Sequence, residues 1–399
     1  MDRQISTLFS LLRAGLWGEP FSPAPDTDWA PIRQELRHHA IQNLPVDILA
    51  KADPANQMVY LRSSVQACTH WYALMQVQQD VTRILEAAAI PCATLKGAAA
   101  DILYPQPLYR SMGDVDLIVK PRDLDRAVAL LTENGCTIHD TRNPRHVELR
   151  KNGIQIELHR HFAALSDPTR ANSLDELLFA ALDRAEKATI DGYEFYMLPP
   201  VENGLVLMEH INSHMESGLG LRQIIDWMLY ADRNLSDETW FGGFSEAIQM
   251  VGLEKLTVTV TRMCQMYLGL RRDITWCRFA DETLCHRLME HTLKQGNFGR
   301  KLDKRTHGAI GVLNVLDSDL NFFQLLQRHG CYNWKALKKH PWLKPFAWLY
   351  QLCRYIRKGL RGRNFIGAFL HAVRKKKESA DLLTELGVQR KDHSLQYEQ

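Results

Sequence analysis

Residues 90–162 differ from the rest of the chain, because they combine several short strand-like runs with one clear amphipathic helix. The helix is expected over 122–134, where apolar residues recur at helical spacing until Gly135. The strand candidates are residues 90–95, 115–119, 136–139, 147–150 and 154–158. The last two flank Asn152-Gly153, a strong signal for a two-residue hairpin turn. This segment therefore predicts a compact α/β unit with a mixed sheet.

Both flanks of this unit have a helical pattern. Residues 57–87 repeat apolar side chains at an approximately helical period, and a helical pattern resumes from Ser173 to about residue 300. We therefore expect an α+β fold, with a small mixed-sheet core embedded in a largely helical protein. The predicted divisions are an N-terminal helical region at 1–88, the α/β core at 89–165, a helical domain at 166–300, and a basic, aromatic helical region with a polar tail at 301–399.

Composition excludes several classes of protein. The 399 residues have a mean hydropathy of -0.28, and no apolar stretch approaches the roughly 18 residues of a transmembrane helix. The first residues contain neither a long apolar core nor a small-residue cleavage site, so no secretory signal is predicted. The eight cysteines lack zinc-ligand spacing and are expected to be reduced thiols. We expect a cytoplasmic protein, with peripheral contact at the inner membrane face as a further option.

The sharpest candidate for chemistry is Gly113-Asp114-Val115-Asp116, at the start of the second strand candidate. Residues i and i+2 of a strand point to the same face, so the two carboxylates can share one site. Two like charges held close together are costly unless a cation lies between them, which is the arrangement of a divalent metal site. Asp-x-Asp alone is a common pair, and the metal interpretation depends on its surroundings.

A third carboxylate comes from the strand candidate at 154–158. Apolar residues alternate here with Gln155, Glu157 and His159, which therefore share one face. Glu157 could join the acidic pair. His159 could lie beside the metal or, if the site transfers a group, beside the molecule that accepts that group. The alternative is the solvated face of an amphipathic strand with a structural histidine.

Lys96-Gly97 ends the first strand candidate and turns towards a short helix. Such a turn exposes main-chain N–H groups beside a lysine, which suits a triphosphate. The turn is not a P-loop, because the Gly-x4-Gly-Lys-Ser/Thr pattern is absent. Arg110-Ser111 precedes the acidic pair, and its guanidinium could contact a phosphate or bridge to Asp114.

The chain resembles the nucleotidyltransferase superfamily of the DNA polymerase beta type in three segments and in their order. These are Leu95-Lys96-Gly97, the run from Arg110 to Val119, and Ile156-Glu157-Leu158-His159. More narrowly, residues 60–232 resemble the bacterial family of uncharacterised nucleotidyltransferases, which carries a Lys-Gly turn and an Arg-x3-Asp-x-Asp-hydrophobic run. Lys96 and Gly97 take the place of the glycine-serine turn of better-studied members, and the serine is missing.

This resemblance implies a small mixed sheet flanked by helices, which binds a nucleoside triphosphate and two Mg2+ ions. The metal ligands and catalytic residues would be Asp114, Asp116 and Glu157, and the nucleotide contacts Lys96, Gly97, Arg110 and Ser111. The implied reaction transfers a nucleoside monophosphate from ATP or another triphosphate to a hydroxyl or phosphate, with Mg2+ or Mn2+, and releases pyrophosphate. Asp116 or Glu157 could accept the proton of an acceptor hydroxyl. A small molecule, a glycan precursor, a peptide or a protein would all fit as acceptor.

Four polar residues recur at helical spacing downstream, His210 with His214 and Arg222 with Asp226. No Glu follows His210, which excludes the His-Glu-x2-His pattern of a metalloprotease. A helical region with histidine and an Arg-x3-Asp pair commonly follows the core in the resembling family. These residues could close over the nucleotide or the acceptor, or Arg222 and Asp226 could form a buried ion pair between helices.

The basic charge is concentrated near the C-terminus. Residues 335–377 hold 13 Lys and Arg and no Asp or Glu, whereas the remaining chain has 36 Lys and Arg against 46 Asp and Glu. Aromatic residues alternate with these cations. The region could lie on anionic lipid, bind nucleic acid, or form a helical subdomain with aromatic core and solvated cations. The residues concerned are Trp334, Trp342, Phe346, Trp348, Tyr350, Tyr355 and Phe365, with Lys335, Lys338, Lys339, Arg354, Arg357, Lys358, Arg361 and Arg363.

Two other functions remain open. The acceptor could be RNA, with the basic region as its binding surface. Alternatively, the chain could be a catalytically inactive binding or scaffold protein that keeps the nucleotide fold and is recruited to a membrane or partner through its C-terminus. The intact carboxylates favour catalysis, and the altered phosphate turn favours the scaffold.

Overall fold

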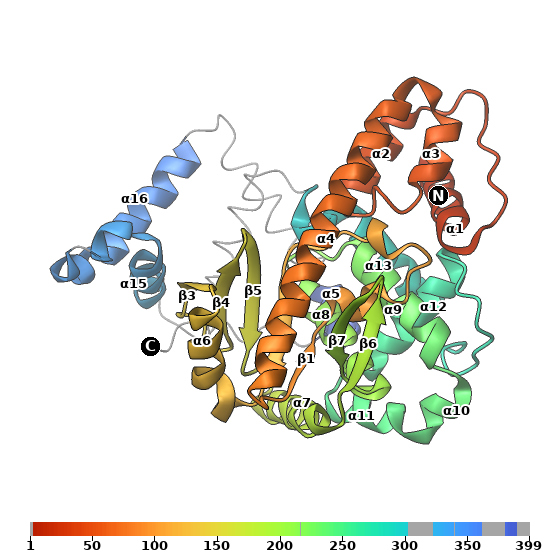
Figure 1. Cartoon of the computed structure of the whole chain (residues 1–399). Coiled ribbons are helices and arrows are strands. Elements are labelled where there is room, and N and C mark those ends of the chain that lie inside the picture. Colours follow the sequence, from red (N-terminus) through yellow and green to blue (C-terminus); the bar gives the residue numbers. More distant parts are fainter. Residues whose placement is uncertain (1–2, 216, 302–321, 339, 361–379, 389–399) are drawn as a thin grey trace. The chain divides into compact units, whose positions relative to one another are not determined.

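A computed structural model describes residues 3–215, 217–301, 322–338, 340–360 and 380–388 of the chain (Figure 1). The chain divides into two compact units, residues 1–300 with 385–399, and residues 301–384. In the described part of the chain, no helix combines the length and apolar character needed to cross a bilayer.

The first unit is built on one seven-stranded mixed sheet with the strand order β3-β4-β5-β2-β1-β7-β6. The β2–β5 and β1–β7 pairs are parallel, and the other four pairs are antiparallel. The strands are β1 (Cys92–Thr94), β2 (Val115–Val119), β3 (Thr137–Asp140), β4 (His146–Lys151), β5 (Ile154–His159), β6 (Glu186–Ile190) and β7 (Tyr193–Met197). The expected mixed sheet is therefore confirmed for the first five strands.

The β6–β7 hairpin corrects the expectation of a helical pattern from Ser173 to about residue 300. Its strands are joined by Asp191-Gly192, both at positive φ, 48° and 82°. Asp-Gly is a typical hairpin turn, so a signal was present in the sequence. The strands lacked a clear apolar alternation because β6 is an edge strand whose side chains are largely exposed. The hairpin extends the sheet on the β1 side.

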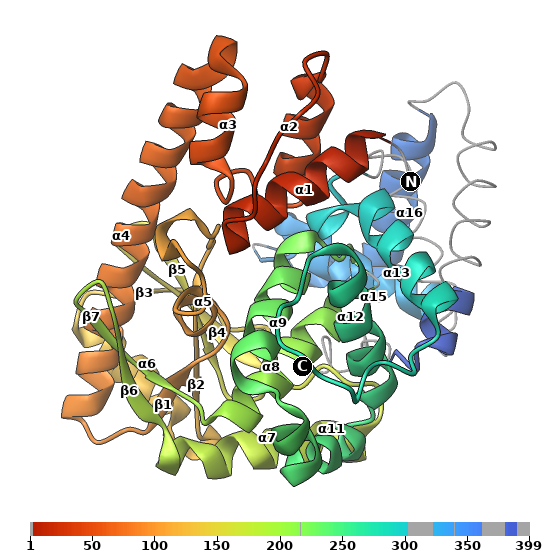
Figure 2. The ribbon, with the colours of Figure 1, turned by 90° about the vertical axis from the view of Figure 1, so that its right-hand side faces the viewer.

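The two faces of the sheet have different coverings. Helices α4 (Gln57–Ala87) and α6 (Leu124–Glu133) pack on one face, where apolar side chains of β2 and β5 meet Leu74, Val77 and Val81 of α4 (Figure 1). Since strand residues alternate, the polar side chains of β2 and β5 point to the opposite face. Helices α8 (Pro200–His214) and α9 (Leu221–Asn234) lie on that side (Figure 2). The functional side chains therefore lie between the sheet and α8.

The remaining helices of the first unit surround these layers. The bounds of α4 match the expected 57–87, and α6 lies within the expected 122–134. The others are α1 (Arg3–Trp17), α2 (Trp29–His38), α3 (Val46–Ala52), α5 (Gly97–Asp101), α7 (Pro168–Ala181), α10 (Asp237–Thr239), α11 (Ser245–Met250), α12 (Glu254–Tyr267) and α13 (Glu282–Gln295). The expected combination of a small mixed sheet with a largely helical chain is confirmed.

Gly204 on α8 allows a close approach to α9. A Cβ at this position would contact the hydroxyl of Tyr230 and lie 2.7 Å from the Phe244 ring. Tyr230 cannot easily give way, because it is buried and its hydroxyl donates to the carbonyl of Pro200 at 2.6 Å. Gly204→Ala should therefore destabilise the fold by about 1–3 kcal/mol through overpacking. Urea denaturation would measure this, with Gly242→Ala as the control because nothing lies within 4 Å of a Cβ there; equal effects would contradict the packing argument.

The second unit contains α15 (Phe322–Asn333) and α16 (Ala347–Leu360), which pack against each other. The Trp334 and Tyr350 rings stack with centroids 4.8 Å apart, whereas Trp342 and Phe346 are exposed. Some of the predicted aromatic residues thus pack within this unit and others reach its surface. Contact with lipid or nucleic acid stays a prediction. Lys339, Arg361, Arg363 and Phe365 lie outside the described residues.

Candidate active site

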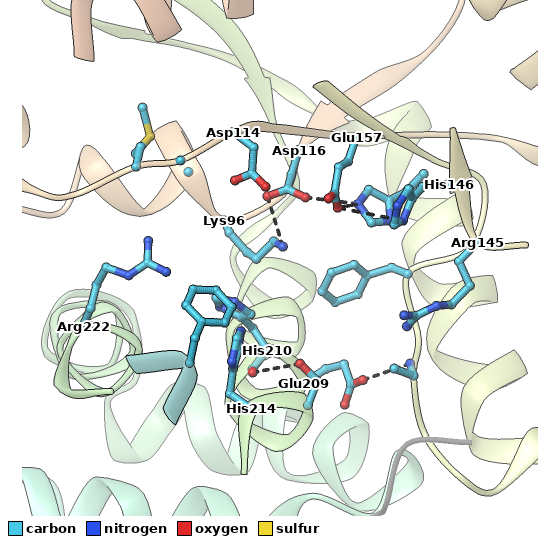
Figure 3. Close-up of a pocket in the computed structure, with 18 of the residues that line it drawn as sticks. Lys96, Asp114, Asp116, Arg145, His146, Glu157, Glu209, His210, His214 and Arg222 are labelled. Atoms are coloured by element: carbon cyan, nitrogen blue, oxygen red, sulfur yellow. Dashed lines mark hydrogen bonds and ion pairs between the residues drawn. The ribbon is translucent and has the colours of Figure 1, made fainter. Parts of the chain in front are cut away.

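The strand register brings the three predicted carboxylates together. Asp116 on β2 lies opposite Glu157 on the parallel neighbour β5, and Asp114 directly precedes β2. One carboxylate oxygen from each residue lies within 4.8 Å of the other two (Figure 3). The site thus gathers where β2 begins, and backbone pairing holds Glu157 of β5 beside it.

Lys96 points into this carboxylate group from the turn after β1. Its Nζ lies 3.0 Å from Oδ2 of Asp116. Its backbone has φ 56° and ψ -130°, a conformation that side-chain-bearing residues rarely adopt, and Gly97 follows with φ 36°. Such strain persists where the surrounding structure over-determines it, and it is common at functional sites. The turn therefore holds the lysine against the acidic cluster.

The carboxylates influence one another strongly. The negative charge of Asp116 and then burial raise the pKa of Asp114 to about 7. For Asp116, burial acts to raise the pKa, but Lys96 and His159 together lower it below its usual range. Both its oxygens are engaged, since Nε2 of His159 lies 3.1 Å from Oδ1. Asp116 is therefore held as a carboxylate, whereas the positive charges of Lys96 and Arg222 offset only part of the repulsion that raises the pKa of Asp114.

A bound cation would relieve this repulsion. The three carboxylates each bring an oxygen within 4.8 Å of the other two, and the negative charge of Asp116 is the largest cause of the raised pKa of Asp114. Carboxylate oxygens are the ligands that Mg2+ prefers. The residues present therefore fit a divalent cation held by Asp114, Asp116 and Glu157.

Arg110 has different partners from those expected. Its guanidinium donates to both oxygens of Asp226, at 2.7 and 2.8 Å, and to Asp101 at 2.9 Å, and it makes no bridge to Asp114. Of the two alternatives for Arg222 and Asp226, the ion pair between them is not seen, because Asp226 accepts hydrogen bonds from Arg110 and from the hydroxyl of Tyr104. A phosphate contact by Arg110 stays a prediction that this geometry does not favour.

Arg222, and not Arg110, has its guanidinium group near Asp114. Its Nη1 donates to the carbonyl of Ser111 at 2.8 Å, and its buried Nε has no hydrogen-bond partner. The guanidinium lines the cavity that contains the carboxylates, near Asp114 (Figure 3). Burial, and then the positive charge of Arg110, lower the pKa of Arg222. Ser111 and Asp226 do not line this cavity.

The opposite wall of the cavity comes from α8. Glu209, His210 and His214 face the carboxylates across a cavity of about 290 Å³ (Figure 3). The rings of His210 and His214 meet edge to face at 4.6 Å, so the predicted histidine pair shares one helix face. Burial, and then the charge of Lys96, lower the pKa of His210 far below its usual range. The wall thus presents a neutral imidazole to the space above the acidic cluster.

Several lining residues were not predicted from the sequence: Arg145, His146, Phe162, Glu209 and Phe298. A signal existed for His146. Counting outward from the Asn152-Gly153 turn pairs Lys151 with Ile154 and therefore His146 with His159, as the structure has it. The other residues come from loops or from a helix face, and their positions depend on the packing of distant segments.

Two comparisons with known proteins found matches. The family described as uncharacterised nucleotidyltransferase matches residues 25–269, which include the whole set of predicted site residues. The crystal structure of an antigenic nucleotidyltransferase-like protein from Paracoccidioides brasiliensis is similar over 52% of this chain and 97% of that chain, with 18% identity and a TM-score of 0.35. No curated protein matches the chain.

Proposed function

The chain belongs to the family of uncharacterised nucleotidyltransferases, and we propose that it transfers a nucleoside monophosphate from a nucleoside triphosphate, with ATP as the first candidate, to a hydroxyl or phosphate of an acceptor. The observation that carries this proposal is the convergence of Asp114, Asp116 and Glu157 beside Lys96. Pyrophosphate would leave, because the bond broken lies between the α- and β-phosphates.

The metal in this proposal is Mg2+ or Mn2+, held by Asp114, Asp116 and Glu157. When bound, it supplies positive charge that stabilises the pentacoordinate phosphate and the leaving pyrophosphate. The residues of the chain do the rest by positioning and by neutralising charge. Lys96 and Arg222 line the cavity and both act on the charge of Asp114, and we assign them to the triphosphate. Asp116 and Glu157 are the candidates to receive the acceptor proton, and both carboxylates already have polar partners within the site.

The acceptor would occupy the other side of the cavity, against His210 and His214. Its class stays open between a small molecule, a glycan precursor, a peptide and a protein. RNA as acceptor, with the basic second unit as its surface, would show itself as salt-dependent binding in a gel-shift experiment.

Incubation of the purified protein with each α-32P-labelled triphosphate, Mg2+ or Mn2+ and a cell extract tests the proposal. We expect a labelled product that is absent with Asp114→Asn/Asp116→Asn, and its chemical nature would identify the acceptor class. Absence of label with either metal, together with absence of nucleotide binding by calorimetry, would support the inactive scaffold instead.

Arg222 provides a separate test of nucleotide binding. Arg222→Gln should weaken Mg2+-dependent ATP binding about tenfold, because it removes a cation whose Nε is unbonded and whose charge faces the cavity. Titration calorimetry measures the change. Arg233→Gln is the matched control, since Arg233 lies on the same helix and also donates to a main-chain carbonyl, that of Ile102. Equal loss in both variants would argue against a direct role of Arg222.

A further inference from the structure

Two buried histidines flank Glu157 on the side away from Asp114. His146 on β4 and His159 on β5 are directly opposite in the antiparallel register, and each is 7% exposed. Their rings lie 4.9 Å apart, and each brings a ring nitrogen within 4 Å of the carboxylate of Glu157; Figure 3 shows His146 beside that carboxylate. Carboxylates alone suit Mg2+, whereas imidazole nitrogens are ligands for transition metals.

The distances among these three side chains match the spacing of metal ligands. Oε2 of Glu157 lies 3.4 Å from Nε2 of His159 and 3.8 Å from Nδ1 of His146. Ligand atoms bound tetrahedrally at zinc-ligand distances lie about 3.4 Å from one another. In addition, Oδ1 of Asp116 lies 3.1 Å from Nε2 of His159 and could complete the set. A small cation could therefore be bound with little rearrangement of the side chains.

The second observation is an unused ligand atom. Nδ1 of His146 is buried, points towards Glu157 and makes no hydrogen bond. Buried polar atoms are nearly always satisfied, and an orphaned one requires an explanation such as an ion. We propose that His146, Glu157 and His159 form a binding site for a divalent transition-metal ion, next to the carboxylate site and sharing Glu157 with it. This goes beyond nucleotidyl transfer and does not require turnover.

Asn143 would control the tautomer of His146. Its Nδ2 lies 3.3 Å from Nε2 of His146, while its Oδ1 accepts the N–H of Arg145. A metal on Nδ1 requires the ring proton on Nε2, which then needs an acceptor rather than an amide donor. Asn143→Asp supplies that acceptor and can still accept from Arg145. Metal binding should therefore tighten several-fold in this variant.

Zn2+ and Co2+ are the probes for the full-length, chelator-treated protein, titrated by calorimetry with Mg2+ in large excess. We expect one Zn2+ per chain that Mg2+ does not displace, and an affinity at least about tenfold weaker in His146→Ala and His159→Ala. His139→Ala removes an exposed histidine from the neighbouring strand β3 and should change nothing. Asp114→Asn should retain the site even where it abolishes nucleotidyl transfer, which separates this inference from the proposed function.

The absorption spectrum of the Co2+ form identifies the ligands. We expect visible absorption bands typical of nitrogen and oxygen ligands and no thiolate charge-transfer band. The visible bands should disappear in His146→Ala. A thiolate band would show that cysteines bind instead. That result would overturn the proposal. So would Zn2+ binding that is unchanged in both histidine variants while circular dichroism shows intact folds. The proposal would also fail if Asn143→Asp did not tighten Zn2+ binding and His146→Ala left the affinity unchanged.

Discussion

Asp116→Asn should abolish Mg2+-dependent triphosphate binding and reduce nucleotidyl transfer at least ~10³-fold, while the fold stays intact. Asp116 is central to the proposed metal site, because its carboxylate lies between Lys96, His159 and the other two acids. Asparagine is nearly isosteric but carries no charge, so a cation would lose one of its three anionic ligands. Calorimetry with ATP and Mg2+ and the labelled-product assay measure the two effects.

The fold should tolerate this change. The loss of charge removes the main cause of the raised pKa of Asp114, since repulsion by Asp116 is the largest contribution. Asn can still accept one hydrogen bond from Lys96 or His159. Asp183→Asn is the control, because Asp183 is an exposed carboxylate paired with Lys120. Unchanged triphosphate binding in Asp116→Asn would refute the site assignment, and loss of binding in the control would point to a general electrostatic effect.

Arg110→Met should lower the free energy of unfolding by about 3–5 kcal/mol. Arg110 is 4% exposed and is paired with Asp101 and Asp226, which are also buried. Methionine fills a similar volume, but both carboxylates then lose their counter-charge. Urea denaturation measures the loss. Arg142→Met breaks the exposed pair with Asp140 and should cost only ~0–1 kcal/mol.

The destabilisation of Arg110→Met should depend on pH. Burial raises the pKa of Asp101 to about 7 even with Arg110 in place. A carboxyl group with a raised pKa in the folded state destabilises that state once pH exceeds its unfolded value, and the cost is complete above the folded pKa. The deficit should therefore be smaller at about pH 5 than at about pH 8. Addition of Asp101→Asn and Asp226→Asn should recover part of the stability; a deficit that is independent of pH and not rescued would indicate a packing defect instead.

Much of the sheet and the acidic site could be predicted because their signals are local. Alternation places Asp114 with Asp116 and Glu157 with His159, and the Asn152-Gly153 turn sets the register of β4 and β5. The family resemblance based on these residues is confirmed by the match over 25–269. The β6–β7 hairpin was missed because an exposed edge strand needs few apolar residues.

The sequence by itself determined the first five strands, the carboxylates and the Lys-Gly turn, because each depends on the spacing of residues a few positions apart. Only the tertiary structure decided the ion pairs and the wall of the cavity. Arg110 pairs with Asp226, 116 residues away, rather than with Asp114, four residues away. Arg222 is thereby left facing the cavity. Which buried charges become partners depends on which helices pack together. Helix packing is determined by many apolar contacts between distant segments, and no local sequence pattern specifies it.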